Sequence, residues 1–238
     1  MTNKGGSRKI KRMAAPAYWP VARKTFKWTV KPNPGPHPIE SSIPLLILVR
    51  DMLGLASSAA EAKKIIHMKK IYVDGKPRWD HKFPVGLMDV ISIPDLDSNY
   101  RVSSDPYKVL KLVKIDKGEA GLKVVKVVKK TTYAGGRIQL TAHDGKNFLV
   151  DPKSEFSKVI PGDSLLISLP SLGIEKRFPL VLGAPVMVIR GKASGHVGRV
   201  EEIGEFITVR DIKNSSLIYR VFPENVIVLG ERDPAISV

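Results

Sequence analysis

Residues 58–79, which read SAAEAKKIIHMKKIYVDGKPRW, combine signals for a helix, a turn and a strand. Ser58 and Glu61 have the spacing of a capping box, in which a hydroxyl and a carboxylate each bind a free amide at the start of a helix. Alanine and isoleucine side chains recur after them at helical spacing. Asp74 and Gly75, between two extended runs, indicate a tight turn. The stretch therefore predicts a helix followed by a small β-hairpin.

The flanking sequence extends this unit on both sides. The two serines at 41–42 can cap an earlier helix, which Pro44 tolerates in its first turn and Gly54 ends. Residues 88–93 (MDVISI) read as a closing strand. We therefore expect a module of two helices and a small sheet within residues 41–104.

The EAKKI helix, the IYVDGK turn and the MDVISI strand, in this order, resemble the S-four RNA-binding domain of ribosomal proteins, pseudouridine synthases and some tRNA synthetases. Met88 stands where that family usually has glycine. In such domains the helix pair and the following loop dock on the RNA backbone. The resemblance implies phosphate contacts by Lys63, Lys64, Lys69, Lys70, Lys76 and Arg78. For each single lysine, a solvated helix face is the alternative.

Positive charge is concentrated at the N-terminus. Residues 1–39 contain nine basic side chains and no acidic one. Aromatic side chains are interspersed among them, and stacking faces beside phosphate contacts favour RNA. The alternative is a disordered solubilising tail, against which the stiff proline-rich stretch 31–38 and two of the three tryptophans argue. The RNA contacts expected in this basic arm are Lys4, Arg8, Lys9, Lys11, Arg12, Trp19, Arg23, Lys24 and Lys27.

The whole chain of 238 residues carries a formal charge of +16 and contains no cysteine. It therefore has no disulfide framework, thiolate nucleophile or cysteine-containing metal site. A hydrophobic content of 43% suffices for packed cores. Its apolar runs are far shorter than the roughly 20 residues that cross a bilayer, and no secretory apolar region precedes Pro16. We expect a folded, cytoplasmic protein that does not cross a membrane.

The sequence after residue 105 is rich in β-branched residues divided by glycine-containing turns, which indicates an all-β region. Lysine and valine alternate imperfectly over residues 123–129. This alternation favours an edge strand whose lysines block further pairing. The expected strands are 109–115, 122–128, 137–141, 147–150 and 164–169.

The pattern changes again near residue 180, where residues 191–200 read as a glycine-rich turn and strand among other short strands. The layout resembles a KOW motif on an SH3-like barrel. In such a hairpin, glycines let backbone amides come close to RNA while basic side chains flank it. The resemblance implies that Lys192 and Arg199 contact RNA. The expected strands are 185–190, 205–210 and 226–229.

Nearly from end to end, the chain resembles the small-subunit ribosomal proteins of the S-four-e family, the archaeal and eukaryotic type. The motifs that carry the resemblance are residues 13–19 (MAAPAYW), 35–37 (GPH), 42–45 (SIPL), 88–93 (MDVISI) and 141–145 (TAHDG). It implies a structural constituent of the small subunit that binds ribosomal RNA beside neighbouring ribosomal proteins, without cofactor, catalysis or small-molecule substrate. The implied fold is α+β and multi-domain, with a basic arm (1–40), an S-four domain (41–104), a central all-β domain (105–176) and a KOW barrel (177–238).

Two other functions remain open at this point. The five histidines lack the paired spacing of metal ligands, so no catalytic or metal site is expected. Asp144, next to His143, adjoins a turn, where aspartate more often caps the backbone than activates a group. One alternative is a free KOW-bearing transcription or translation factor, which would not need the acid-free arm. The other is a non-catalytic subunit of an RNA-modifying enzyme.

Overall fold

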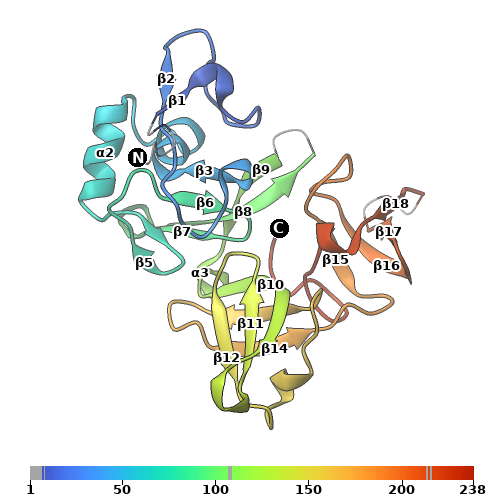
Figure 1. The fold of residues 1–238 in the computed structure, drawn as a ribbon. Coiled ribbons are helices and arrows are strands. Elements are labelled where there is room, and N and C mark those ends of the chain that lie inside the picture. The colour runs from blue at the N-terminus through green and yellow to red at the C-terminus, as the bar shows by residue number, and fades with distance from the viewer. Residues whose placement is uncertain (1–6, 8, 107–108, 213, 215) are drawn as a thin grey trace, which may run out of the picture.

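The chain folds into three β-rich units, and an arm packs on the first of them (Figure 1). The structure is a computed structural model that describes residue 7 and residues 9–106, 109–212, 214 and 216–238. Three antiparallel sheets of five strands each dominate this part of the chain. No helix within it is long and apolar enough to span a membrane.

The first unit, which we call the helical module (residues 41–115), contains the helix predicted from the capping box. Helix α2 spans Ala59–His67, and Ser58 Oγ accepts a hydrogen bond from the Glu61 N–H at 3.2 Å. The Glu61 carboxylate accepts from the N–H of Ser57 at 2.9 Å, one residue earlier than a regular capping box requires. The serine cap of α2 is thus confirmed, with a shifted return bond.

The first helix begins later than the sequence predicts. Helix α1 spans Leu45–Ile47, runs into a π-helical turn at Leu48–Met52 and ends before Gly54, whose φ is +65°. The predicted serine cap is wrong, because Ser42–Pro44 forms strand β3 and pairs with β6 (Pro84–Gly86). A residue that precedes proline is driven toward extended backbone, so the helix cannot start before Pro44.

The sheet of the helical module has the order β5-β4-β7-β8-β9. Asp74 and Gly75 join β4 to β5 with φ values of +53° and +71°, the left-handed conformations that this turn signal predicts. The β8–β9 hairpin spans the boundary expected at residue 104, so residues 109–115 extend this sheet and do not start the next one. The strands are β4 (Tyr72–Val73), β5 (Lys76–Pro77), β7 (Val90–Ile93), β8 (Ser98–Asp105) and β9 (Val109–Ile115).

The expected strand 88–93 begins two residues late, because β7 starts at Val90 and Met88 lies before it. Met88 adopts a φ of +66° with its side chain fully buried. Glycine adopts this backbone conformation without a steric penalty, which explains the glycine usual at this position in the S-four resemblance. In this chain the apolar side chain of Met88 packs in the core, and this burial offsets the steric penalty of the positive φ.

The two remaining sheets are antiparallel and follow one another in sequence, joined to β9 by helix α3 (Lys117–Ala120). The central sheet has the order β12-β11-β10-β13-β14, and the C-terminal sheet has the order β18-β17-β16-β15-β19. The central strands are β10 (Leu122–Thr132), β11 (Ile138–Ala142), β12 (Asn147–Val150), β13 (Ser164–Ser168) and β14 (Ile174–Phe178). The C-terminal strands are β15 (Pro185–Val188), β16 (Val197–Ile203), β17 (Ile207–Asp211), β18 (Ile218–Val221) and β19 (Val226–Val228).

A continuous hydrophobic core connects the arm, the helical module and the C-terminal sheet. The arm contributes Ala15, Trp19 and Val21 to this core. A second core lies in the central sheet. The arm is therefore docked on the body by apolar burial.

The edge-strand interpretation of residues 123–129 is wrong, since β10 is the middle strand of its sheet. Lys123 is fully buried, and its Nζ lies 2.7 Å from Asp74, 2.6 Å from Asp89 and 3.1 Å from Asp144. Asp74 and Asp89 belong to the helical module. The ammonium of Lys123 thus joins two units through three carboxylates.

Two further side chains complete this buried charge cluster. Lys146 Nζ lies 2.7 Å from Asp74 and 2.8 Å from Asp144. His37 Nε2, from the arm, lies 3.1 Å from Asp89, and the His37 ring covers Gly86 so closely that any side chain there would overlap it. Burial alone would raise the pKa of Asp89, but Lys123 and His37 outweigh burial and hold that pKa below its ordinary range.

We expect Lys123→Met to lower the free energy of unfolding by about 3 to 5 kcal/mol, because it leaves buried carboxylates without their cation. Urea unfolding followed by circular dichroism measures this change. Lys129→Met, at an exposed position of the same strand, is the control and should change stability by less than about 0.5 kcal/mol. Equal effects of the two substitutions would contradict a joining role for Lys123.

Candidate nucleic-acid interface

Helix α2 places one side in the core and the other in solvent. Ala62 and Ile66 are buried, whereas Lys63 and Lys64 are exposed, as the periodicity predicts. Lys69, just past the helix, has a φ of +58° and is exposed as well. Within the described residues these three lysines form no ion pair, so no protein carboxylate competes with a phosphate for them.

The other cations expected in this module are held by protein groups to different degrees. Lys70 Nζ lies 2.6 Å from Asp95 in a pair that is about half exposed. Lys76 is exposed on β5. The Arg78 guanidinium lies over the Phe83 ring at 4.2 Å from its centroid, a cation–π contact that fixes its orientation. The structure thus brings the six cations to one module but leaves only some of them unpaired.

The arm presents an exposed aromatic ring flanked by cations. Strands β1 (Ile10–Lys11) and β2 (Trp28–Thr29) form a short ribbon. Trp28 is 43% exposed, and the Nζ atoms of Lys9 and Lys27 lie 5.7 and 5.3 Å from its ring centroid. Such a ring can stack on a base while the two ammonium groups contact phosphates.

Trp19, which the sequence assigned to RNA contact, has no ring face available in this structure. It is 3% exposed, and its Nε1 donates a hydrogen bond to the Ser42 carbonyl at 2.9 Å. The Tyr18 hydroxyl donates to the same carbonyl at 3.0 Å. Trp19 therefore anchors the arm, whereas the rings of Trp28 and Phe26 are exposed. The sequence neighbours of the two tryptophans could have indicated which ring is exposed. Trp28 lies between Lys27 and threonine, whereas Trp19 lies between tyrosine and proline.

Arg12 also has a structural role. It is 8% exposed, and its guanidinium donates to the Ala22 carbonyl and to Thr25 Oγ1, both at 2.7 Å. Its Nε donates to the Trp28 carbonyl at 3.2 Å. These bonds hold the loop that presents Trp28, and they leave little of the Arg12 guanidinium exposed to a ligand.

The remaining cations of the arm differ in exposure. Arg23 is half-buried and donates to the Ala15 carbonyl at 3.3 Å. Lys11 and Lys24 are exposed, as are Lys9 and Lys27 beside Trp28. Lys4 and Arg8 lie outside the described residues.

The glycine-rich turn of the C-terminal sheet packs against protein more than the sequence suggests. A Cβ on Gly195 would meet the Ser104 carbonyl at 2.6 Å, and one on Gly198 would overlap the Arg210 carbonyl. Only Gly191, with φ +96°, faces open space there. Strands β8 and β17 occupy the side of Gly195 and Gly198 on which a side chain would stand, so glycine is required there for packing, and the approach of this turn to RNA stays a prediction.

The two basic residues of this turn remain at the surface. Lys192 is exposed, and Arg199 is exposed with its Nη2 at 3.3 Å from Asp233. The tight packing beneath them fixes the backbone from which they project. They lie on a different unit from the lysines of α2, so the predicted RNA contacts are spread over three surfaces.

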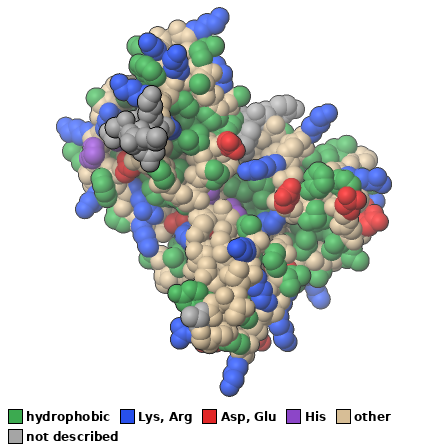
Figure 2. Space-filling model, viewed as in Figure 1, with side chains coloured by type: hydrophobic (Ala, Val, Ile, Leu, Met, Phe, Trp, Pro, Cys, Tyr) green, Lys and Arg blue, Asp and Glu red, His purple; other side chains and the backbone are tan. Residues whose placement is uncertain are grey.

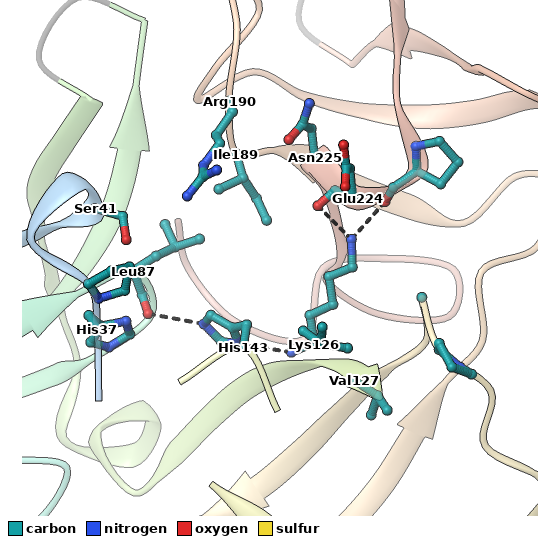
Figure 3. Close-up of a pocket in the computed structure, with 15 residues that line it drawn as sticks. His37, Ser41, Leu87, Lys126, Val127, His143, Ile189, Arg190, Glu224 and Asn225 are labelled. Atoms are coloured by element: carbon teal, nitrogen blue, oxygen red, sulfur yellow. Dashed lines mark hydrogen bonds between the residues drawn. The ribbon is translucent and has the colours of Figure 1, made fainter. Parts of the chain in front are cut away.

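A cavity of about 620 Å³ opens where the arm, the helical module, the central sheet and the C-terminal sheet meet (Figure 3). Lys126 lies in it with its Nζ donating to the backbone carbonyls of Pro223 at 2.7 Å and Glu224 at 2.8 Å. Burial lowers the pKa of Lys126 to about 8, against the opposite effect of Glu224. Arg190 points into the same cavity in Figure 3.

The neutral side chain of His143 connects the backbone segments that meet at this junction. Its Nδ1 accepts a hydrogen bond from the Lys126 backbone N–H at 3.2 Å, and its Nε2 lies 3.4 Å from the Leu87 carbonyl. Burial, aided by the charges of Lys123 and His37, lowers the pKa of His143 to about 4. Both ring contacts are to backbone atoms, so His143 supports structure.

Three known families and domains match successive parts of the chain. They are the RS4NT domain over residues 4–40, the S4 domain over residues 44–91 and Ribosomal family S4e over residues 96–174. The S4 match falls on the helical module. These matches define a ribosomal-family protein that contains an RNA-binding S4 domain.

Relatives and a solved structure narrow this class. The chain is 53% identical to "Small ribosomal subunit protein eS4" of Korarchaeum cryptofilum, covering 100% of this chain and 99% of that one. It is 43% identical to the same-named protein of Staphylothermus marinus, covering 100% and 98%. The crystal structure of the 30S ribosomal protein S4e from Thermoplasma acidophilum superposes with a TM-score of 0.68 at 30% identity, covering 80% of this chain and 96% of that one. The chain belongs to ribosomal family S4e and is not an enzyme.

The neutral state of His143 has a consequence for acid stability. Because its pKa falls from the ordinary 6.5 to about 4, the unfolded chain binds a proton in this pH window that the folded chain does not. Stability should therefore be full above pH 6.5 and fall as the pH drops toward 4, by about 3 kcal/mol from this residue. Urea unfolding at several pH values measures the decline.

His143→Gln should flatten the decline, whereas His67→Gln, at an exposed position, should leave it unchanged. The same slope in the wild type and in His143→Gln would show that another group controls this window.

Proposed function

We propose that the chain is a structural constituent of the small ribosomal subunit in the cytoplasm, where it holds ribosomal RNA beside neighbouring ribosomal proteins. Relatives that align with this chain over nearly their whole length are named small ribosomal subunit proteins. The observation that supports RNA binding most directly is Trp28, exposed between Lys9 and Lys27. The unpaired Lys63, Lys64 and Lys69 offer a second surface.

We further propose four functional parts. The arm (1–40), the S4 domain (41–115), the central all-β domain (116–176) and a KOW-type, SH3-like barrel (177–238) would act as one body. The β8–β9 pairing supports a boundary after residue 115 in place of 104. The five-stranded antiparallel C-terminal sheet and its glycine-rich turn support the barrel.

Affinity in this proposal comes from the release of counterions. Each cation that neutralises a phosphate contributes about 0.7 to 0.9 to the slope of log affinity against log salt concentration. Shape selectivity comes from the fixed spacing of the arm, the lysines of α2 and the turn with Lys192, since one connected core and one charge cluster hold these surfaces.

Four exposed lysines of the arm provide a test that does not unfold it. Truncation of the arm would remove Trp19 from the core, so substitution is preferable. Replacing Lys9, Lys11, Lys24 and Lys27 with Gln should lower affinity for small-subunit RNA on the order of tenfold and reduce the salt slope by roughly 3. Filter binding at several salt concentrations measures both. The matched Lys→Arg variant should keep the slope, and an unchanged slope in the Gln variant would reject the arm as an RNA contact.

The unpaired lysines of the helical module provide a separate test. The triple variant Lys63→Gln, Lys64→Gln, Lys69→Gln should weaken RNA binding severalfold with a stability change below about 0.5 kcal/mol. The control removes three exposed lysines elsewhere: Lys114, Lys117 and Lys129. Equal losses in both variants would indicate unspecific attraction in place of a contact made by α2.

A further inference from the structure

The cavity at the junction of the four parts of the chain is not used by the surfaces described so far. Its volume of about 620 Å³ lies within the range of roughly 300 to 1,000 Å³ that is usual for ligand sites. Much of its wall is apolar, with contributions from Leu87, Val127, Ile189 and three prolines. Such walls suit the flat faces of an organic ligand.

Polar groups that lack a protein partner also line this cavity. The Arg190 guanidinium points into it in Figure 3 and forms no hydrogen bond or ion pair with any described residue. The Asn225 amide and the Ser41 hydroxyl likewise have no hydrogen-bond partner within the part of the chain that the structure describes. Lys126 uses two of its three N–H donors on backbone carbonyls. Donors and acceptors are therefore available to a ligand.

The ionisable groups that line the cavity leave it positively charged. Lys126 and Arg190 stand against one carboxylate, that of Glu224. Burial lowers the pKa of His143 to about 4, so this ring is neutral at pH 7. His37 is already paired with a carboxylate of the buried charge cluster. A ligand with one negative charge, such as a single phosphodiester, would balance the excess cation.

The rim of the cavity continues in sequence into the turn that carries Lys192. Gly191 follows Arg190 directly, and no atom lies within 4 Å of the place where its side chain would stand. Lys192 is exposed, so an RNA backbone can come close to the main chain between two cations. Glu40, exposed next to Ser41 in the sequence, forms no ion pair within the described residues and leaves Arg190 free.

We propose that this cavity binds one unstacked nucleotide of ribosomal RNA. The inference rests on the proposed function and adds a subsite to it. Arg190 contacts the phosphate, the apolar walls cover the faces of the base, and the Asn225 amide pairs with its edge through one donor and one acceptor. An apolar protein side chain in the same place would leave both of these polar groups without partners. The nucleotide comes from a loop or bulge, where unstacking costs least.

A variant that fills the cavity tests the insertion of a base. Val128 lines the cavity and is 56% exposed, so Val128→Trp can occupy the space without disturbing a core. Leu149→Trp, at a 53% exposed position of the same sheet outside this cavity, is the matched control. Small-subunit RNA bound to the full chain is probed with dimethyl sulfate and a carbodiimide, which modify unpaired bases. We expect the wild type and Leu149→Trp to protect an unpaired nucleotide that Val128→Trp leaves reactive.

The phosphate contact is tested separately by filter binding at several salt concentrations. Arg190→Gln should lower affinity for small-subunit RNA about fivefold and the salt slope by roughly 0.7 to 0.9. Arg220→Gln removes an exposed arginine of the same unit that also has no ion pair with a described residue, and it should change affinity less than about twofold. Equal losses in the two variants would indicate general attraction and overturn the role of Arg190.

The footprint separates this inference from the proposed function. If the wild type binds RNA and Val128→Trp gives the same footprint, the cavity holds no base and the inference fails, while RNA binding stands. A loss of affinity in Arg190→Gln with an unchanged footprint in Val128→Trp would show a phosphate contact at the rim alone, which also overturns the inference. Absence of RNA binding by the wild type would reject the proposed function itself.

Discussion

The architecture depends on one buried ammonium group. Lys123 Nζ has no contact with water and is stabilised only because Asp74, Asp89 and Asp144 surround it. An unpaired charge at this depth would cost several kcal/mol, so the helical module and the central sheet can adopt only arrangements in which all of these groups meet. Hydrophobic contact alone tolerates sliding, whereas a cluster of short ion pairs requires one geometry.

Local sequence signals predicted the helices, turns and strands that are determined by residues close to one another in the sequence. The Ser58 cap, the Asp74-Gly75 turn and strands β9 and β12 are found as the sequence indicates. Strands β8, β14 and β18 were missed, because polar or charged residues interrupt their alternation and their partners supply the pairing.

The edge-strand interpretation of Lys123 and the expected exposure of Trp19 differ from the structure for the same physical reason. Lys123 has the sequence context of an exposed edge lysine, but carboxylates far away in the sequence bury it. Trp19 and Trp28 are chemically equal, and only the position of the core decides which ring is exposed. Side-chain type predicted that this chain binds a polyanion, while the choice of individual contacts required the tertiary structure.

The charge cluster also has a consequence for the order of events during translation. Asp74 and Asp89 are synthesised before Lys123, because the chain is made from its N-terminus. A nascent helical module therefore contains two carboxylates whose counter-ion has not yet been made. The helical module therefore lacks the cation of its buried carboxylates until β10 has been made, so it reaches its final stability only after the central sheet has folded against it.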